Sequence, residues 1–372
     1  MTRKHKPVPD EAAPRLWPGA AADPAHTVPA TRLAVANLRL ADGQRVRVAV
    51  GGRGIPLVVA HGFSFAVMVY VQSLSRLASM GFKVIAVDLA GHGGSGGLVD
   101  RGHLLDEYRL FLGRVLDELG VERAVLAGHS LGGRLVAELA AAEPERAIAL
   151  LLVGAATGRR WDDLAAFSGW SPPILGLVGA TLVADTLGAL FLSGNQSAKL
   201  QALALPQTIS NFVAPWRLMA PALSVLLAPA SVPTLQRLRT ARVPVFVLHG
   251  DQDPVVPLAA ARDTAAEAGG ELVVVHSAGH SWLLEDPETV LAITAELLSD
   301  GLGEACLDAL VAAGLAPDTV SLAELERAFY APGALIHRLT PRPVQSEVHP
   351  SQLPRYRWTR IPAPPRDDRG VA

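Results

Sequence analysis

The strongest chemical signal in this sequence is a serine that stands between two glycines. Residues 126–133 read LAGHSLGG, so Gly128, Ser130 and Gly132 form a G-x-S-x-G pattern. A serine on a sharp turn between a strand and a helix can act as a nucleophile, because the turn exposes its hydroxyl oxygen. Ser95 fits the same pattern within GHGGSGG, so the pattern alone does not choose between the two serines.

The flanking sequence favours Ser130. The apolar run AVLAG precedes it and predicts a buried strand, and the stretch LGGRLVAELAAAEPE after it predicts a helix. The N-terminus of that helix would favour negative charge at the serine, and the two glycines would avoid a clash where strand and helix cross. Ser95 instead stands among five glycines between residues 91 and 97. We therefore expect Ser130 to be the nucleophile and Ser95 to be a loop residue.

A serine nucleophile needs a base, and the base needs a carboxylate to orient it. Candidates follow two later apolar runs. Asp251 and Asp253 come after PVFVLHG, and His280 comes after ELVVVH within SAGHSW. These loops would lie at the carboxyl ends of their strands, where open α/β sheets place their sites. His276, at the end of a strand, is the rival base, and His129 is expected to point away from its neighbour Ser130.

Eight short apolar runs would supply the elements that position these residues. The first two alternate in polarity and turn at Asp42–Gly43, which predicts a hairpin. The later runs are continuous and β-branched, as in strands covered on both faces, and helical stretches separate them. The sequence therefore predicts an α/β fold with a doubly wound, mostly parallel sheet. The runs are LAVANLRL, QRVRVAV, PLVVA, KVIAVD, AVLAG, AIALLLV, PVFVLHG and ELVVVH.

The regular alternation of strands and helices breaks once. About ninety residues separate Val153 from Val243, too many for a simple crossover, so we expect an inserted module. Between residues 164 and 236 only Asp185, Lys199 and Arg217 are charged. We expect a mostly helical cap over residues 155–240 with an apolar inner face. Residues 174–192 are apolar enough to suggest a membrane span, but the central Asp185 favours a buried or lipid-touching cap.

Composition limits the remaining possibilities. The chain has 372 residues and a net charge of −2, which argues against nucleic acid as a partner. Its single cysteine, Cys306, excludes an internal disulfide and suits a reducing compartment, so we expect a cytoplasmic protein. No Cys/His cluster has the spacing of a zinc site, and we expect no metal. Residues 1–30 lack the apolar stretch of a secretory signal and are expected to form a flexible tail.

The chain beyond residue 299 is expected to form an extension to the sheet domain. Residues 303–313 predict a short helix, and Ser321 with Glu324 predicts a capping box at the start of another. Residues 338–372 are rich in Pro and Arg and are expected to be irregular, as a tail or a strap on the domain or on a partner.

Residues 33–298 resemble the α/β-hydrolase superfamily. The resemblance rests on five motifs in order: HGF (61–63), DLAGHGGS (88–95), GHSLGG (128–133), HGDQDPVVP (249–257) and AGHSWLLEDPE (278–288). One departure is Ala90, where the family often has proline. The resemblance implies an eight-stranded sheet, a core of residues 31–154 and 241–298, and a cap inserted after the sixth strand.

The resemblance also assigns roles to single residues. It implies Ser130 as the nucleophile, His280 as the base and Asp253 as the acid. The backbone N–H groups of Phe63 and Leu131 would form the oxyanion hole, which stabilises charge in the tetrahedral intermediate. It implies acyl transfer on a small apolar substrate without a cofactor.

Two alternatives stay open. Serine-dependent relatives that cleave carbon–carbon bonds bind a substrate carboxylate through a cap arginine, for which Arg217 is the candidate, with Trp282 beside the histidine. The other alternative is a ligand-binding member of the superfamily without catalysis. We expect no integral membrane span, and the apolar cap leaves peripheral membrane contact open. The sequence does not give the oligomeric state.

Overall fold

The computed structural model describes most of the chain from residue 33 onward. The described ranges are 33–63, 65–98, 104–170, 219–339, 342–343 and 353–364, together with isolated positions between 171 and 218. The flexible tail predicted for residues 1–30 lies outside the described residues, and so does Arg217.

A single sheet forms the centre of the described part, in the order β10-β8-β7-β6-β5-β3-β4-β2-β1-β9. All eight predicted strands are present. They are β1 (Ala34–Arg39), β2 (Arg45–Gly51), β3 (Ile55–Ala60), β4 (Phe82–Val87), β5 (Ala124–His129), β6 (Ala147–Val153), β7 (Val245–Gly250) and β8 (Glu271–Val275). The strands from β3 to β8 are mostly buried along their length, as continuous apolar runs predict.

The pairing directions confirm a doubly wound, mostly parallel sheet. The strands β1 and β2 form the predicted antiparallel hairpin, and β2 also pairs antiparallel with β4. The five pairs that join β4, β3, β5, β6, β7 and β8 are all parallel. The carboxyl ends of these parallel strands therefore meet along one edge of the sheet.

Within the described residues the sheet has ten strands, rather than the eight that the resemblance implied. The extra strands, β9 (Arg342–Pro343) and β10 (Trp358–Ile361), come from the region that was expected to be irregular. They pair antiparallel with β1 and β8 and so cover both edges of the eight-stranded core. Such short strands are held by the edge they join rather than by a pattern of their own, which is why the sequence did not predict them.

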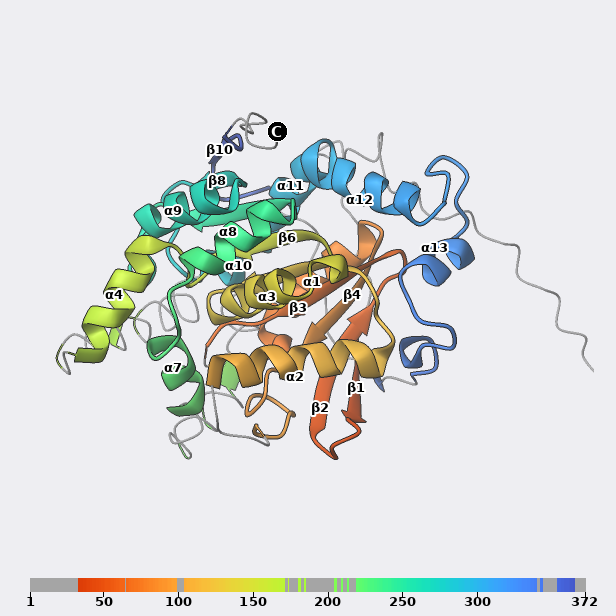
Figure 1. The fold of residues 1–372 in the computed structure, drawn as a ribbon, viewed down its shortest axis with the longest axis horizontal. Coiled ribbons are helices and arrows are strands. Elements are labelled where there is room, and N and C mark those ends of the chain that lie inside the picture. Colours follow the sequence, from red (N-terminus) through yellow and green to blue (C-terminus); the bar gives the residue numbers. More distant parts are fainter. Residues whose placement is uncertain are drawn as a thin grey trace, which may run out of the picture.

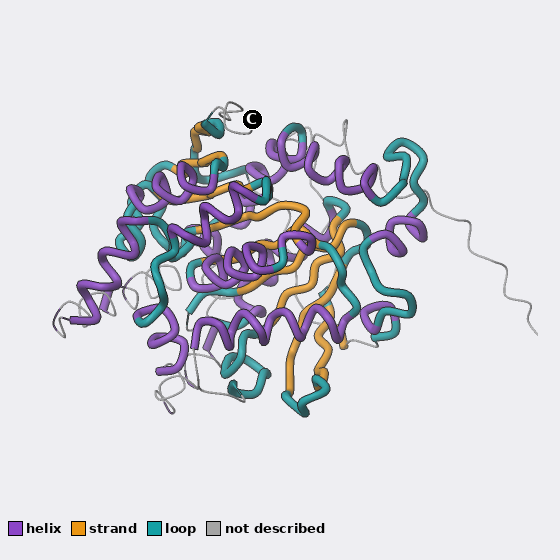
Figure 2. Tube along the Cα trace, viewed as in Figure 1, coloured by secondary structure: helices purple, strands orange, loops and turns teal. Residues whose placement is uncertain are grey.

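Helices cover both faces of the sheet (Figures 1 and 2). One layer contains α2 (Leu104–Leu119), α3 (Leu131–Ala142), α8 (Val232–Thr240) and α9 (Leu258–Ala268), which pack against one another in that order. The opposite layer contains α1 (Val71–Ser79), α11 (Pro287–Leu298) and α12 (Gly301–Ala312). The short α10 (Trp282–Glu285) leads into α11. The predicted capping box is confirmed, because Ser321 and Glu324 bond reciprocally at the start of α13 (Leu322–Ala328).

The inserted segment leaves the sheet after β6 and is mostly helical where it is described. It begins with α4 (Arg159–Trp170) and includes α7 (Met219–Leu226), which lie to one side of the sheet in Figure 1. Residues 174–192 lie mostly outside the described residues. Within the described ranges, no helix has both the length and the apolar character needed to cross a membrane. The predicted domain boundaries stay predictions.

Candidate active site

Ser130 lies on a strained turn between β5 and α3. Its backbone has φ 53° and ψ −116°, a conformation that is uncommon for a residue with a side chain. Three backbone hydrogen bonds hold it there: its N–H donates to Val153 O at 2.9 Å, and its carbonyl accepts from Arg134 N at 3.1 Å and from Ala156 N at 3.2 Å. The sharp turn predicted from the sequence is therefore present.

The glycines on either side of Ser130 are required by close backbone contacts. A Cβ atom on Gly128 would lie 2.3 Å from the carbonyl carbon of Gly132, where strand and helix cross. A Cβ on Gly132 would lie 2.2 Å from Ala60 O, at the end of β3. The predicted reason for both glycines is confirmed. The start of α3 thus lies directly against the chain that leads to Gly62 and Phe63.

His280 and Asp253 form a buried pair. The distance from His280 Nδ1 to Asp253 Oδ2 is 2.7 Å, and both side chains are 1% exposed. The other carboxylate oxygen, Oδ1, accepts from Val255 N and Val256 N at 2.8 Å each. Burial alone would raise the pKa of Asp253, but His280, His249 and the hydrogen bond from Val256 N together hold that pKa below its usual value. Because a carboxylate only accepts, the His280 proton lies on Nδ1, which leaves Nε2 as the basic atom.

The pair and the serine meet around the carboxyl end of β6. A Cβ on Gly154 would lie 3.4 Å from the ring of His280 and 3.7 Å from Asp253 Oδ2. Its neighbour Val153 accepts the hydrogen bond from the backbone of Ser130. Three separate loops, after β5, β7 and β8, therefore meet at one point on the sheet edge.

A second buried network, which the sequence did not predict, runs beneath this point. Tyr70 ends a short 3-10 helix (Val67–Tyr70), and its hydroxyl accepts from Gly62 N at 3.2 Å. The hydroxyl also lies 2.9 Å from His129 Nδ1. The opposite ring atom, His129 Nε2, lies 3.1 Å from His280 O, and the two histidine rings are tilted by 40° to each other with centroids 4.8 Å apart.

The proton positions in this network follow from its acceptors. His280 O can only accept, so His129 carries its proton on Nε2 and receives the Tyr70 hydroxyl proton at Nδ1. Burial lowers the pKa of His129 to about 3, which keeps the ring neutral as this arrangement requires. The network links the loop after β3, the serine turn and the loop of His280. As expected, His129 does not point at the serine hydroxyl.

Of the two predicted oxyanion donors, Leu131 follows the serine directly in the chain, and Phe63 belongs to the loop after β3 that passes close to it. Leu131 is the first residue of α3 and is buried, and its N–H is one of those that a helix leaves without an internal partner. Phe63 follows Gly62, whose Cβ, if present, would lie 3.4 Å from Ser130 Cβ. Their role in stabilising an oxyanion stays a prediction.

Comparison with known proteins identifies the family. A family model described as "Alpha/beta hydrolase family" matches residues 57–293. A protein of Mycobacterium phage D29 that carries the name of a non-heme haloperoxidase is 36% identical over 70% of this chain and 94% of its own length. The chain belongs to the alpha/beta hydrolase family.

Two further relatives of this alpha/beta hydrolase carry names of ester-cleaving enzymes. A monoacylglycerol lipase of Mycolicibacterium smegmatis is 28% identical over 65% of this chain and 85% of its own length. The solved structure of the esterase RhEst1 from Rhodococcus sp. ECU1013 is 26% identical, with a TM-score of 0.54, and the match covers 73% of this chain and 100% of that one. Together with the family match, these relatives show that the chain is a hydrolase of this family.

The rival residues have other partners. The hydroxyl of Ser95 donates to Asp88 O at 2.6 Å and accepts from Arg47 N at 3.0 Å, so the prediction of a loop residue is confirmed. His276 pairs with Asp251 at 2.9 Å in a separate and more exposed contact, in which its side chain is 44% exposed.

Trp282 and Arg217 were predicted to contact the substrate. Trp282 is completely buried within the main hydrophobic core of this hydrolase, and its role in substrate contact stays a prediction. The same holds for Arg217, which is not among the described residues. No group of three His, Cys, Asp or Glu residues in the described ranges could hold a metal ion.

A cavity of about 560 Å³ lies away from the His280–Asp253 pair, between α2, α3, α7 and α8. Its lining includes none of Ser130, Asp253 and His280. Its charged residues pair locally, Arg109 with Asp106 and Arg237 with Glu138. Buried groups arranged for proton transfer mark a reaction site better than volume does. We therefore place the candidate active site at the sheet edge.

Proposed function

We propose that this protein is a serine hydrolase that cleaves an apolar carboxylic ester, or a related acyl compound, through an acyl-enzyme on Ser130. The observation that carries the proposal is the buried 2.7 Å contact between His280 and Asp253, beside the strained serine turn. Two relatives with the names of a lipase and an esterase support an ester as the substrate.

The proposed reaction has two steps. Ser130 Oγ attacks the acyl carbon while His280 Nε2 takes its proton, and Asp253 stabilises the imidazolium that forms. The N–H groups of Phe63 and Leu131 stabilise the negative oxygen of the tetrahedral intermediate. His280 then returns the proton to the leaving alkoxide, and the ester bond breaks. In the second step a water molecule, activated in the same way, releases the acid and regenerates the serine.

The inserted segment supports an apolar acyl group. It is nearly free of charged residues between 164 and 236, and its described side chains include strongly exposed apolar ones, with Phe167 62% and Leu227 70% exposed. An apolar segment near the serine would exclude water and favour acyl chains. Each methylene buried in such a pocket is worth up to about 0.8 kcal/mol.

Labelling with a fluorophosphonate tests the nucleophile. Wild-type protein should label and hydrolyse p-nitrophenyl esters, and Ser130→Ala should lose both, with turnover falling by about four to six decades. Ser95→Ala, which changes a serine in the same sequence pattern, is the matched control and should keep both. Near-normal activity of the Ser130→Ala variant would show that the nucleophile is another residue.

A series of p-nitrophenyl esters tests the acyl class. The ratio kcat/KM should rise a few-fold per added methylene from acetate toward medium-length chains, until the pocket is full. If acetate is the best substrate and activity declines steadily with chain length, the apolar-ester proposal should be dropped.

A further inference from the structure

We infer that residues 355–361, here called the strap, position the loop that carries His280, so that the active site is incomplete without this part of the C-terminal extension. The inference rests on the proposed function of His280. The family match ends at residue 293, so the strap lies outside the part of the chain that the family model describes.

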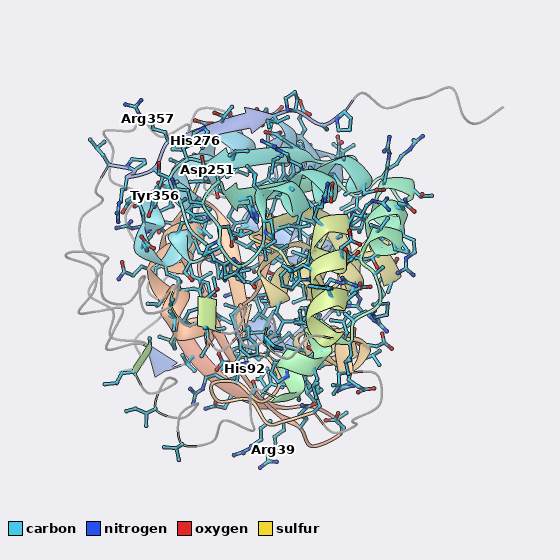
Figure 3. The ribbon with its side chains drawn as sticks, turned by 90° about the vertical axis from the view of Figure 1, so that its left-hand side faces the viewer. Arg39, His92, Asp251, His276, Tyr356 and Arg357 are labelled. Atoms are coloured by element: carbon cyan, nitrogen blue, oxygen red, sulfur yellow. The ribbon has the colours of Figure 1, made fainter. Side chains whose placement is uncertain are left out.

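The strap first contacts the strand that leads into the His280 loop. Its strand β10 pairs antiparallel with β8 from Trp358↔Val275 to Ile361↔Leu272. The pairing continues one residue further, because His276 N donates to Arg357 O at 2.8 Å. Figure 3 shows Arg357, His276 and Asp251 gathered at one corner of the molecule. The backbone is thereby fixed four residues before His280.

Side chains extend this contact to the loop that carries Asp253. Thr359 Oγ1 lies 2.8 Å from His276 Nε2, and His276 Nδ1 lies 2.9 Å from Asp251 Oδ2. The other oxygen of Asp251 accepts from Ser277 N at 2.7 Å, where Ser277 has a positive φ of 59°. A residue in that conformation needs surrounding contacts to hold it. Thr359, His276 and Asp251 therefore join the strap to both loops of the base–acid pair.

The other end of the strap holds the chain that follows His280. Arg355 N donates to Asp286 Oδ2 at 2.6 Å, and the hydroxyl of the buried Tyr356 donates to Glu285 Oε2 at 2.8 Å. Asp286 also caps α11 through Glu288 N. These contacts lie five and six residues after His280, so the strap fixes both ends of the same loop.

The position of this loop matters for the reaction rate. A base must lie within hydrogen-bond reach of the serine hydroxyl, and a misplacement of about 1 Å costs on the order of a hundredfold in rate. The strap residues do not touch the reacting atoms. Thr359 and Tyr356 are therefore positioning residues, and weakening them should lower kcat while leaving substrate binding nearly unchanged.

The test uses the full-length double variant Tyr356→Phe/Thr359→Val, which removes two hydroxyl contacts and little volume. The expected result is a fall in kcat on the order of tenfold with KM within about twofold of wild type. Hydrogen exchange in residues 276–286 should become faster. Thr359→Ser in the Tyr356→Phe background, which restores a hydroxyl at this position, should recover part of kcat.

The matched control is Ser321→Ala, in the same C-terminal extension but outside the strap. It removes the capping box at the start of α13, which among the described residues has no contact with the His280 loop. This variant should lower the melting temperature but keep kcat. The inference is wrong if the double variant keeps kcat within about twofold of wild type, or if kcat in both variants simply follows the loss of stability.

Failure of the two proposals can be told apart. If the proposed function is wrong, wild-type protein will not hydrolyse esters through Ser130, whatever the strap does. If only the strap inference is wrong, the wild type will be active and the double variant equally so. Should the double variant fail to fold, Tyr356→Phe alone gives the same comparison of kcat with KM, and unchanged values there overturn the inference.

Discussion

Two carboxylates that lie two residues apart in the chain serve different histidines. Asp253 is buried against His280, whereas Asp251 contacts the more exposed His276. Asp253→Asn should lower kcat by about 10⁴-fold, because the amide no longer holds the His280 tautomer or stabilises its imidazolium. Asp251→Asn should cost on the order of tenfold through the position of the loop. Steady-state kinetics on one ester measures both, and equal effects would mean that the acid is misassigned.

Among single residues, the sequence predicts those that follow strands. It misses residues whose role depends on a contact with a distant part of the chain. Ser130, Asp253 and His280 each come within a few residues after an apolar run. Parallel strands bring the loops at their carboxyl ends to one edge of the sheet. Tyr70 lies in the apolar stretch VMVY, which gives no sign of a polar role. Its partner His129 is 59 residues away, so only the folded chain reveals their contact.

Among the elements, α3 is tied to both ends of the inserted segment by one buried arginine. Arg134 donates to Glu138 at 2.8 Å and to Pro229 O at 2.7 Å, and lies 3.7 Å from Asp162 on α4. Asp162 in turn accepts from the backbone and hydroxyl of Ser231. The helix that begins at the serine is thereby connected to the first described helix of the insertion and to the chain before α8.

Removing this arginine should be costly. Arg134→Met would remove the buried guanidinium from beside Glu138 and Asp162, whose side chains are each only 14% exposed, and should lower the free energy of unfolding by about 3–5 kcal/mol. Arg237→Met, which removes an exposed arginine 3.8 Å from the same Glu138, should cost less than about 1 kcal/mol. Urea unfolding of both variants measures the difference, and similar losses would contradict the assigned role of Arg134.

The strands differ in how well the sequence pattern predicts them. The eight core strands are long enough, and buried enough, for their apolar runs to predict them. The four residues of β10 follow closely after Pro354 and directly precede Pro362, and their sequence WTRI has no clear alternation. They form a strand because β8 offers an unpaired edge and Arg360 finds two carboxylates there. Tertiary context decides such an element, as it often does for short strands.

For the whole molecule, buried histidines make stability depend on pH. Burial lowers the pKa of His61 to about 4 and that of His129 to about 3, from an ordinary value of 6.5, and it also lowers the pKa of His249. Below that ordinary value the unfolded chain binds protons that the folded chain does not. The free energy of unfolding should therefore fall as the pH falls, by about 1 kcal/mol per pH unit for each histidine, until each folded pKa is reached.

Urea unfolding between about pH 7 and pH 5 measures this slope. A variant His129→Gln, which removes one of these groups, should show a shallower slope than the wild type. His61 and His129 both stay neutral in the folded chain over this range. A stability that does not change over the range would contradict the neutral, buried state of both rings.

The pairing of both sheet edges with the C-terminal extension has a consequence for how the chain folds. Val35 pairs with Arg342 across most of the sequence, and Val274 pairs with Thr359 at the opposite edge. Both short strands are held by a sheet edge that must form before they can pair with it, and the closure entropy of the longer loop slows the first of these contacts further. The parallel core can assemble without them. In refolding experiments we therefore expect sheet formation to precede the return of ester hydrolysis, with docking of the last strand as the slower event that separates the two.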